Sequence, residues 1–286
     1  MPNVTSSAVS PAVPDSEGWF CLRSLPTVYS LRPLTRHAHL PKLAIDTPRL
    51  LTSEACARLH VLPPVECLHV VATITRRAMR HLLRLPGLEL LDVMRMVGPG
   101  RMSGWGGAIT LHTLRMSYGT ESDLFAIAEC ASLREIALQH AEVTPRALDA
   151  LLRLPLLSAL DLEGTAFDDR MAEVVAACTQ LERLDLGATR LTASGLAHLQ
   201  RMPALRSLDV WSTAIDEAAL ACLPEFPALE FLSLGSAWGE PSLDADRIVP
   251  VLLDMPHLKR LWLDGVVIDQ AQKERLDAKL EWTCFM

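Results

Sequence analysis

The sequence predicts an α/β solenoid: a right-handed horseshoe with a parallel sheet on its concave face and helices on its convex face. Three observations support this. A Leu-x-x-Leu-x-Leu pattern recurs at an almost fixed step, helix-capping residues follow it at a constant offset, and prolines precede most of the later copies. Self-similarity at a period of about 20–29 residues is typical of stacked strand-and-helix repeats. Because such repeats pack only on their neighbours, we expect an elongated array.

The strand signal is clearest where Leu157, Leu181, Leu205 and Leu229 follow one another at steps of 24 residues. We expect the apolar positions of each copy to point into the core, and the residues between them to face the concave side, since side chains alternate along a strand. Ten candidate repeats begin at Leu40, Val65, Leu88, Leu111, Leu133, Leu157, Leu181, Leu205, Leu229 and Leu258.

The helix signal lies eleven residues after the strand start, where the side chains are good acceptors for the first N–H groups of a helix. These predicted N-caps are Thr144, Asp168, Thr192, Asp216 and Asp269. Proline stops a helix and favours extended backbone before it. The predicted stops are Pro155, Pro203, Pro227 and Pro256.

A threonine ladder lies eight residues after the strand start, and its hydroxyls are suited to bonding the backbone of the adjacent turn. We expect this role to be structural. The ladder comprises Thr73, Thr165, Thr189 and Thr213.

Two segments break the repeat. The stretch from Gly98 to Gly107 is too rich in glycine and proline for a helix, so we expect an irregular loop there. It lacks the Gly-Lys-Ser/Thr ending of a phosphate-binding loop. The last full repeat is 29 residues long, because the segment from Gly235 to Pro241 enlarges a turn and is expected to expose Trp238.

The predicted organisation has four parts. Residues 1–17 form a disordered tail, or alternatively an uncleaved export signal for a bacterial injection machine. Residues 18–39 form an N-terminal cap in which Trp19, Phe20 and Leu22 cover the first repeat, and the repeats occupy residues 40–269. Residues 270–286 form a C-terminal cap in which Trp282 and Phe285 close the core.

Composition narrows the functional classes. The net charge of −7 gives no support to nucleic-acid binding, and no apolar run is long enough to span a membrane. The seven cysteines do not form a disulfide pattern, so a cytoplasmic location is the simplest expectation, with secretion into a host cell as the alternative. His37 and His39 have no neighbouring ligand cluster, and no nucleophile motif is present. We therefore predict no metal, no cofactor and no catalytic residue.

The stretch from Leu181 to Ala197, with leucines at 181, 184 and 186 and Thr189 after them, resembles the short, threonine-containing leucine-rich repeats of bacterial proteins. It is similar to the ribonuclease-inhibitor-like and cysteine-containing subclasses. The run from Gly195 to Leu199 also resembles repeats of plant-pathogen effectors that combine an F-box with leucine-rich repeats. This resemblance covers residues 40–269 and implies a protein-binding solenoid.

One outward column, four residues after each strand start, contains Asp161, Asp185 and Asp209 in consecutive repeats. Strands about 4.8 Å apart would place these like charges side by side. Arg183 and Arg206 are close enough in sequence to offset the repulsion. The column is either a solvated face or an anionic strip that accepts Arg or Lys from a partner.

Aromatic residues gather in the same C-terminal repeats, where Trp211, Phe231, Trp238 and Trp262 predict an apolar patch beside the acidic strip, with Arg260 at its rim. Aromatic side chains are enriched at binding hot spots. Alternatively, these side chains only pack against one another and the cap.

The combined interpretation is a non-enzymatic module that binds a partner protein on its concave face, as a bacterial effector or as an inhibitor or immunity protein. The alternative is an adaptor that recruits substrates to an enzyme such as a ubiquitin ligase. A partner with a basic surface would complement the acidic strip.

Overall fold

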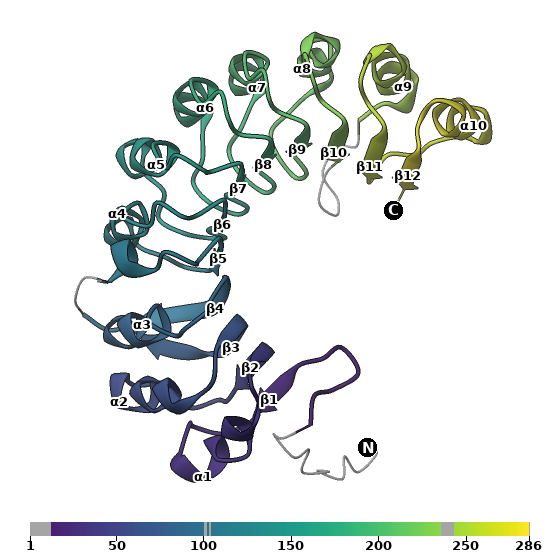
Figure 1. Ribbon diagram of the computed structural model, residues 1–286. Helices are drawn as coiled ribbons and strands as arrows, with labels where there is room; N and C mark the ends of the chain where they lie inside the picture. Colours follow the sequence, from purple (N-terminus) through teal and green to yellow (C-terminus); the bar gives the residue numbers. More distant parts are fainter. Residues whose placement is uncertain (1–12, 100–101, 103, 236–242, 286) are drawn as a thin grey trace. The chain divides into compact units, whose positions relative to one another are not determined.

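The computed structural model describes residues 13–99, 102, 104–235 and 243–285. The chain divides into two compact units. Unit 1 comprises Met1–Ser117 and Glu129–Ser132, and unit 2 comprises Tyr118–Ala128 and Leu133–Met286. Each unit contains a parallel sheet whose strands follow one another in chain order, with helices along one side (Figure 1).

Every strand pair within the two units is parallel, as the prediction requires. The strands of unit 1 are β1 (Phe20–Leu22), β2 (Leu40–Asp46), β3 (Val65–Thr75), β4 (Leu90–Val97) and β5 (Thr113–Met116). The strands of unit 2 are β6 (Glu135–Ala137), β7 (Ala159–Asp161), β8 (Arg183–Asp185), β9 (Ser207–Asp209), β10 (Phe231–Gly235), β11 (Arg260–Asp264) and β12 (Trp282–Phe285).

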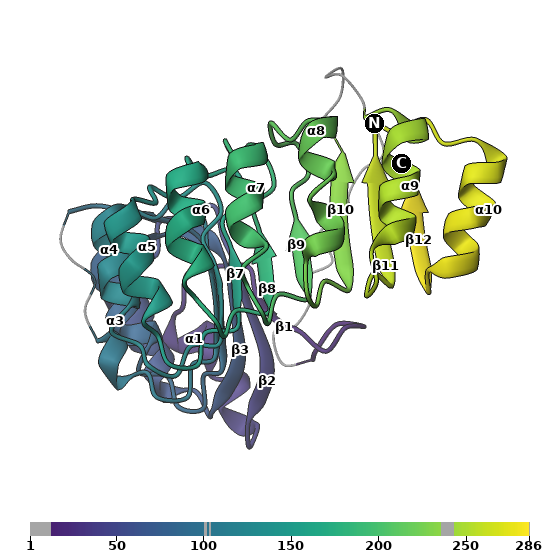
Figure 2. The same ribbon diagram turned by 90° about the horizontal axis from the view of Figure 1, so that it is seen from above.

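The helices connect consecutive strands, and those of unit 2 lie side by side along one face of the sheet (Figure 2). Unit 1 contains the α-helices α1 (Val28–Leu31), α2 (Ser53–Ala57) and α3 (Arg76–Leu82) and the 3₁₀ turns Leu34–Arg36, Arg58–Val61 and Trp105–Gly107. Unit 2 contains α4 (Glu121–Ile127), α5 (Pro145–Leu152), α6 (Asp169–Ala176), α7 (Ala193–Leu199), α8 (Glu217–Leu220), α9 (Ala245–Asp254) and α10 (Gln270–Lys279), with a 3₁₀ turn at Leu223–Glu225.

The core lies between sheet and helices, and it contains all ten residues that were predicted to begin the repeats. Each of them is at most 4% exposed. β2 and β3 begin at Leu40 and Val65 as predicted, whereas in the other eight repeats the strand begins two residues later. In those eight repeats the first apolar residue is buried, but it precedes the hydrogen-bonded strand.

All five predicted N-caps are confirmed, since each side chain accepts a hydrogen bond from a backbone N–H in the first turn of its helix. The threonine ladder is confirmed in unit 2: the hydroxyls of Thr165, Thr189 and Thr213 each donate to a carbonyl oxygen three residues earlier. At Thr73 the expectation of a turn is wrong. That residue lies within β3, which continues through a register shift after Val70 to Thr75.

The glycine-rich segment replaces a helix, as expected. Between β4 and β5 the described residues contain only the 3₁₀ turn that begins at Trp105, whose side chain is fully buried. The second predicted irregularity, which includes Trp238, lies outside the described residues.

The two predicted caps each contribute a strand. Phe20 and Leu22 of β1 are buried, and β1 pairs with β2, whereas Trp19 is only half-buried. The expectation that Trp282 closes the core is wrong, because Trp282 pairs in register with Arg260 and therefore shares its outward face. Its side chain is 43% exposed. The buried apolar side chains of α10 and the residue after it are Leu276 and Leu280.

Candidate functional site

The outward column of unit 2 forms as predicted. Asp161, Asp185 and Asp209 pair in direct register across β7, β8 and β9. The column continues from Asp209 to Ser233 of β10 and Trp262 of β11. Three carboxylates therefore lie on neighbouring strands, with hydroxyl and indole groups beyond them.

Each aspartate of the column is held by the turn that follows its strand. One carboxylate oxygen accepts a hydrogen bond from the backbone N–H two residues later, at 2.9 Å in all three repeats. Short polar side chains commonly stabilise turns in this way. The N–H donors belong to Glu163, Gly187 and Trp211. The repeated aspartate thus has a structural role, and its second oxygen extends the acidic face.

Burial and like charge raise the pKa of two aspartates of this column, Asp185 and Asp209, and of the neighbouring Glu163. Burial raises the pKa of Asp185 to about 7, and repulsion from Asp209 adds to the effect. Burial also raises the pKa of Asp209, against the opposing hydrogen bonds from Trp211 and Ser233. The pKa of Glu163 is raised first by burial and then by Asp161. Burial and like charge both disfavour the ionised form, so a cation placed here would be stabilised.

The expectation that Arg183 and Arg206 offset these charges is wrong. The Arg183 guanidinium bonds the carboxylate of Glu135, and that of Arg206 bonds Glu230. Both arginines lie outside the aspartate column, because they precede the aspartates by two and three positions. A side chain two residues earlier on a strand shares the face but lies in a separate column.

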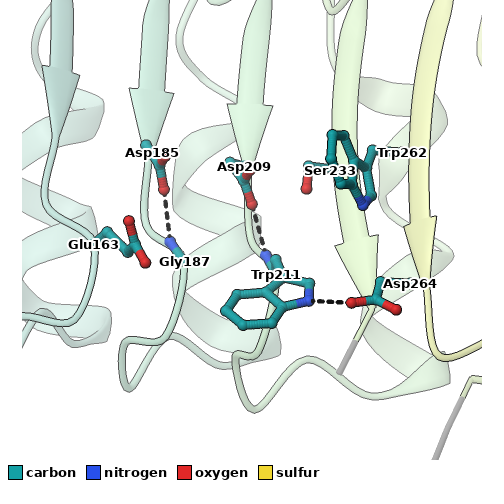
Figure 3. Close-up of a pocket in the computed structure, with 8 residues that line it drawn as sticks. All are labelled: Glu163, Asp185, Gly187, Asp209, Trp211, Ser233, Trp262 and Asp264. Carbon is teal, nitrogen blue, oxygen red and sulfur yellow. Dashed lines mark hydrogen bonds between the residues drawn. The ribbon is translucent and has the colours of Figure 1, made fainter. Parts of the chain in front are cut away.

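A pocket of about 240 Å³ opens over the carboxyl ends of β8 to β11 (Figure 3). It lies entirely within unit 2. Its charged and aromatic lining residues are Glu163, Asp185, Asp209, Trp211, Trp262 and Asp264. None of the described residues that line it is Lys, Arg or His.

The two tryptophans of the pocket are held differently. The Trp211 indole N–H donates to the Asp264 carboxylate at 3.1 Å, which joins the repeats of β9 and β11 (Figure 3). Trp262 also lines the pocket, and its ring centroid lies 6.3 Å from that of Trp282 in a tilted arrangement. Both indoles are half-buried, so part of each remains available to a ligand.

The predicted site residues fall into three groups. Asp185, Asp209, Trp211 and Trp262 line the pocket together. Asp161 lies beside the pocket in the same column. The third group consists of Phe231 and Arg260, which pair with each other, the guanidinium lying 5.4 Å from the ring centroid. The last predicted residue, Trp238, lies outside the described part of the chain.

The sequence interpretation missed Glu163, Gly187, Asp264 and Ser233 as pocket residues. Glu163, Gly187 and Asp264 follow their strand starts by six residues, as Trp211 does. They therefore form a second column at the ends of the strands. The period that found the aspartates could have found this column as well.

Two carboxylates of the pocket and that of Asp161 beside it lie close enough to share a cation. Oxygens of Asp161, Glu163 and Asp185 all lie within 4.8 Å of one another. The side-chain amide of Gln139 donates to Asp161 at 3.2 Å and to Glu163 at 3.0 Å, so part of this charge already has a partner.

Comparisons with known proteins show the fold alone. No protein-family model matches the chain, and no curated protein matches it. Among solved structures, the chain is similar to the crystal structure of an internalin from Listeria monocytogenes, with a TM-score of 0.54 and 17% sequence identity. The match covers 91% of this chain and 71% of the internalin chain.

Within the described residues, no helix has the length and apolar character needed to cross a membrane. The parallel strands, the buried leucine positions of the repeat and the internalin likeness agree on one architecture. The chain has the fold of a leucine-rich-repeat solenoid.

Proposed function

We propose that this chain is a non-enzymatic binding module that holds a partner protein against the outward face of β7 to β11. One observation carries the proposal: Asp161, Asp185 and Asp209 form an in-register acidic column, and no described Lys or Arg side chain forms an ion pair with it. A surface with unbalanced charge beside half-exposed indoles is suited to a protein partner with basic side chains.

The aromatic residues support the same assignment. Trp211 and Trp262 line the pocket, and Phe231 lies on the neighbouring column with Arg260 over its ring. Tryptophan and arginine are enriched among the residues that dominate binding energy at protein interfaces. The face thus combines aromatic anchors with an acidic strip, and a basic partner surface would match both.

The proposal also covers the class of protein and the compartment in which it acts. The threonine ladder and the resemblance of the stretch from Leu181 to Ala197 favour a bacterial repeat of the threonine-containing type. We assign the protein to the effectors or to the inhibitor and immunity proteins, acting in the cytoplasm or in a host cell. Dependence of export on residues 1–17 would favour the effector, whereas protection against a toxin encoded beside this gene would favour the immunity protein.

The test is affinity capture from cells that produce the protein, followed by mass spectrometry. The binding-face variant is Asp185→Arg with Trp262→Ala. The matched control carries the same kinds of change outside the proposed face, with Glu173→Arg on α6 and Leu156→Ala between α5 and β7, both at exposed positions. Circular dichroism establishes that both variants fold.

The control is expected to retain the captured partner and the binding-face variant to lose it. The proposal is wrong if the folded Asp185→Arg/Trp262→Ala variant captures the same partner at the same yield as the wild type.

A further inference from the structure

We propose that the pocket over β8 to β11 binds a single arginine side chain of the partner protein, with the guanidinium held between carboxylates and indoles. The inference rests on the proposed function, and it deepens that function by naming the group recognised. It follows from the charge, the geometry and the size of the pocket.

The negative charge of the pocket favours a cationic ligand. Four carboxylates line one cavity, those of Glu163, Asp185, Asp209 and Asp264. None of the described lining residues is Lys, Arg or His. Arg183 of β8 and Arg206, which precedes β9, are engaged with Glu135 and Glu230 instead. A cationic ligand would relieve the repulsion that burial intensifies, whereas an anionic or neutral ligand would not.

The carboxylates are fixed before any ligand arrives. Gly187 and Trp211 donate backbone N–H bonds to Asp185 and Asp209, each at 2.9 Å, and so orient both side chains. Asp264 is oriented in the same way by the Trp211 indole. Groups that are held in place by neighbouring bonds lose little entropy on binding a ligand.

The shape of the pocket favours a guanidinium over an ammonium. Asp185 and Asp209 lie on adjacent strands, about 4.8 Å apart, and a planar fork with five donors can reach both carboxylates at once. Trp211 and Trp262 supply flat faces, on which arginine stacks more readily than lysine (Figure 3). A lysine ammonium is compact and strongly hydrated, so it would use fewer of these groups.

The size of the pocket points to a side chain. Its volume of about 240 Å³ is below the roughly 300–1,000 Å³ of sites for drug-sized ligands. A divalent cation is the competing occupant of an acidic site. Asp161, Glu163 and Asp185 are the carboxylates that come within 4.8 Å of one another. An ion held by these three would leave Asp209, Asp264 and both indoles of the pocket unused, whereas a guanidinium can contact them.

The test uses the full chain labelled with ¹⁵N, and follows the Trp211 indole N–H signal, which is assigned with Trp211→Phe. The probes are N-acetyl-arginine methylamide, the corresponding citrulline and lysine compounds, and calcium chloride. Citrulline keeps the shape of arginine and removes its charge. The arginine probe is expected to shift the signal with a millimolar dissociation constant, the lysine probe at least threefold more weakly, and citrulline not at all.

A matched pair of variants locates the effect. Asp185→Asn with Asp209→Asn keeps an oxygen acceptor for each backbone N–H but removes both charges, and is expected to weaken the arginine probe at least tenfold. Asp149→Asn, on the exposed face of α5, is expected to leave it unchanged. Equal shifts with citrulline, an equal or tighter response to lysine, or a response to calcium alone would each overturn the inference, as would no response to arginine.

These outcomes are distinct from those that test the proposed function. Suppose that the arginine probe causes no shift while the Asp185→Arg/Trp262→Ala variant still loses its captured partner. The face then binds protein, but the pocket does not recognise arginine. If the probe binds and the partner is retained by that variant, the pocket recognises arginine outside the proposed interface.

Discussion

The two units use the same strand-and-helix repeat, yet their outward columns differ in how charge is arranged. In unit 1 the column contains His69, Asp92 and Arg115 on successive strands, and His69 approaches Asp92 at 2.8 Å. In unit 2 the same position contains Asp161, Asp185 and Asp209. The first column places one carboxylate between an imidazole that is hydrogen-bonded to it and a guanidinium, whereas the second repeats a single charge.

The aromatic residues of the two units also differ in whether a cation of the chain contacts them. In unit 1 the Lys42 ammonium lies 5.6 Å from the Trp19 ring centroid, so an indole on that face already has a cation. In unit 2 the pocket indoles Trp211 and Trp262 have no such contact among the described residues. The same fold therefore provides a column of mixed residues in unit 1 and a column of like charges in unit 2, in which no aspartate forms an ion pair with a described Lys or Arg.

The largest expected effect concerns the way unit 1 compensates for its missing helix. Trp105 is fully buried in the loop between β4 and β5 and fills core space that a helix occupies in other repeats. Trp105→Ala should lower the free energy of unfolding by about 3–5 kcal/mol, the usual cost of emptying a large core position. Denaturant-induced unfolding followed by circular dichroism measures this.

A second substitution at the same position sharpens that result. The Trp105 indole N–H has no hydrogen-bond partner among the described residues. Trp105→Phe should therefore cost less than about 1.5 kcal/mol, because the smaller ring leaves a gap but removes an unsatisfied buried donor. A loss from Trp105→Phe as large as that from Trp105→Ala would show that the N–H is satisfied in solution. Trp282→Ala, at an exposed indole, is the control and should change stability little.

The next effect concerns how Asp185 of unit 2 makes stability depend on pH. The pKa of Asp185 is about 7 in the folded chain, against an ordinary value of 3.8. Between these values the folded state keeps a proton that the unfolded state has lost, so this group makes stability fall as pH rises from about 4 to 7. Asp161, Glu163 and Asp209 face it and act in the same direction. Asp185→Asn should therefore stabilise the protein at pH 8 by about 1–3 kcal/mol and leave it nearly unchanged at pH 3.5.

Asp92→Asn in unit 1 is the matched control and should have the opposite sign. It removes the partner of His69 at a half-exposed pair, so stability at pH 5.5 should fall by about 0.5–1 kcal/mol. Urea unfolding of both variants across pH measures the two effects. If Asp185→Asn destabilises the protein at pH 8, the carboxylate is not under repulsion and the contrast between the units disappears.

Much of the fold could be predicted from the sequence because the repeat enforces it. The capping residues Asp168 and Thr192 and the turn threonines Thr165 and Thr189 all occupy fixed offsets within a constant period of 24 residues. Where the period is not constant the prediction weakens. Thr73 stands at the ladder offset but lies inside β3, because the register shift after Val70 lengthens that strand.

The candidate site could be predicted only in part. The aspartate column follows from strand register alone, so its geometry is set by the period. The period does not determine which partner a side chain bonds. Arg183 and Arg206 bond Glu135 and Glu230 in columns of their own, which depends on rotamers and on competing partners. Trp211 and Asp264 occupy the same offset in their repeats, so the period places them in one column. The period does not show that the Trp211 indole reaches across the intervening repeat to bond Asp264.

A smaller effect concerns the capping of one helix in each unit, α7 in unit 2 and α3 in unit 1. In unit 2 the Thr192 side chain accepts from the Ser194 N–H and donates to Asp169, whereas in unit 1 Thr75 begins α3 without a side-chain cap. Thr192→Ala should lower the free energy of unfolding by about 1 kcal/mol, the usual value of a capping residue, and Thr75→Ala by much less. Thermal unfolding of both variants measures the difference. Equal losses would mean that the Thr192 side chain does not stabilise α7 as a cap.

The smallest expected effect tests whether the aspartate column stands apart from its neighbouring arginines. Arg183 is half-exposed and bonds Glu135, which lies in a different column from Asp185. Arg183→Gln should therefore cost no more than about 0.5–1 kcal/mol, as exposed ion pairs do, and should leave the titration of Asp185 nearly unchanged. Carbon-detected NMR of the Asp185 carboxylate across pH 5–9 measures the titration. A clear rise of its pKa in Arg183→Gln would show that Arg183 does neutralise the column, and the acidic face of unit 2 would then be balanced internally like that of unit 1.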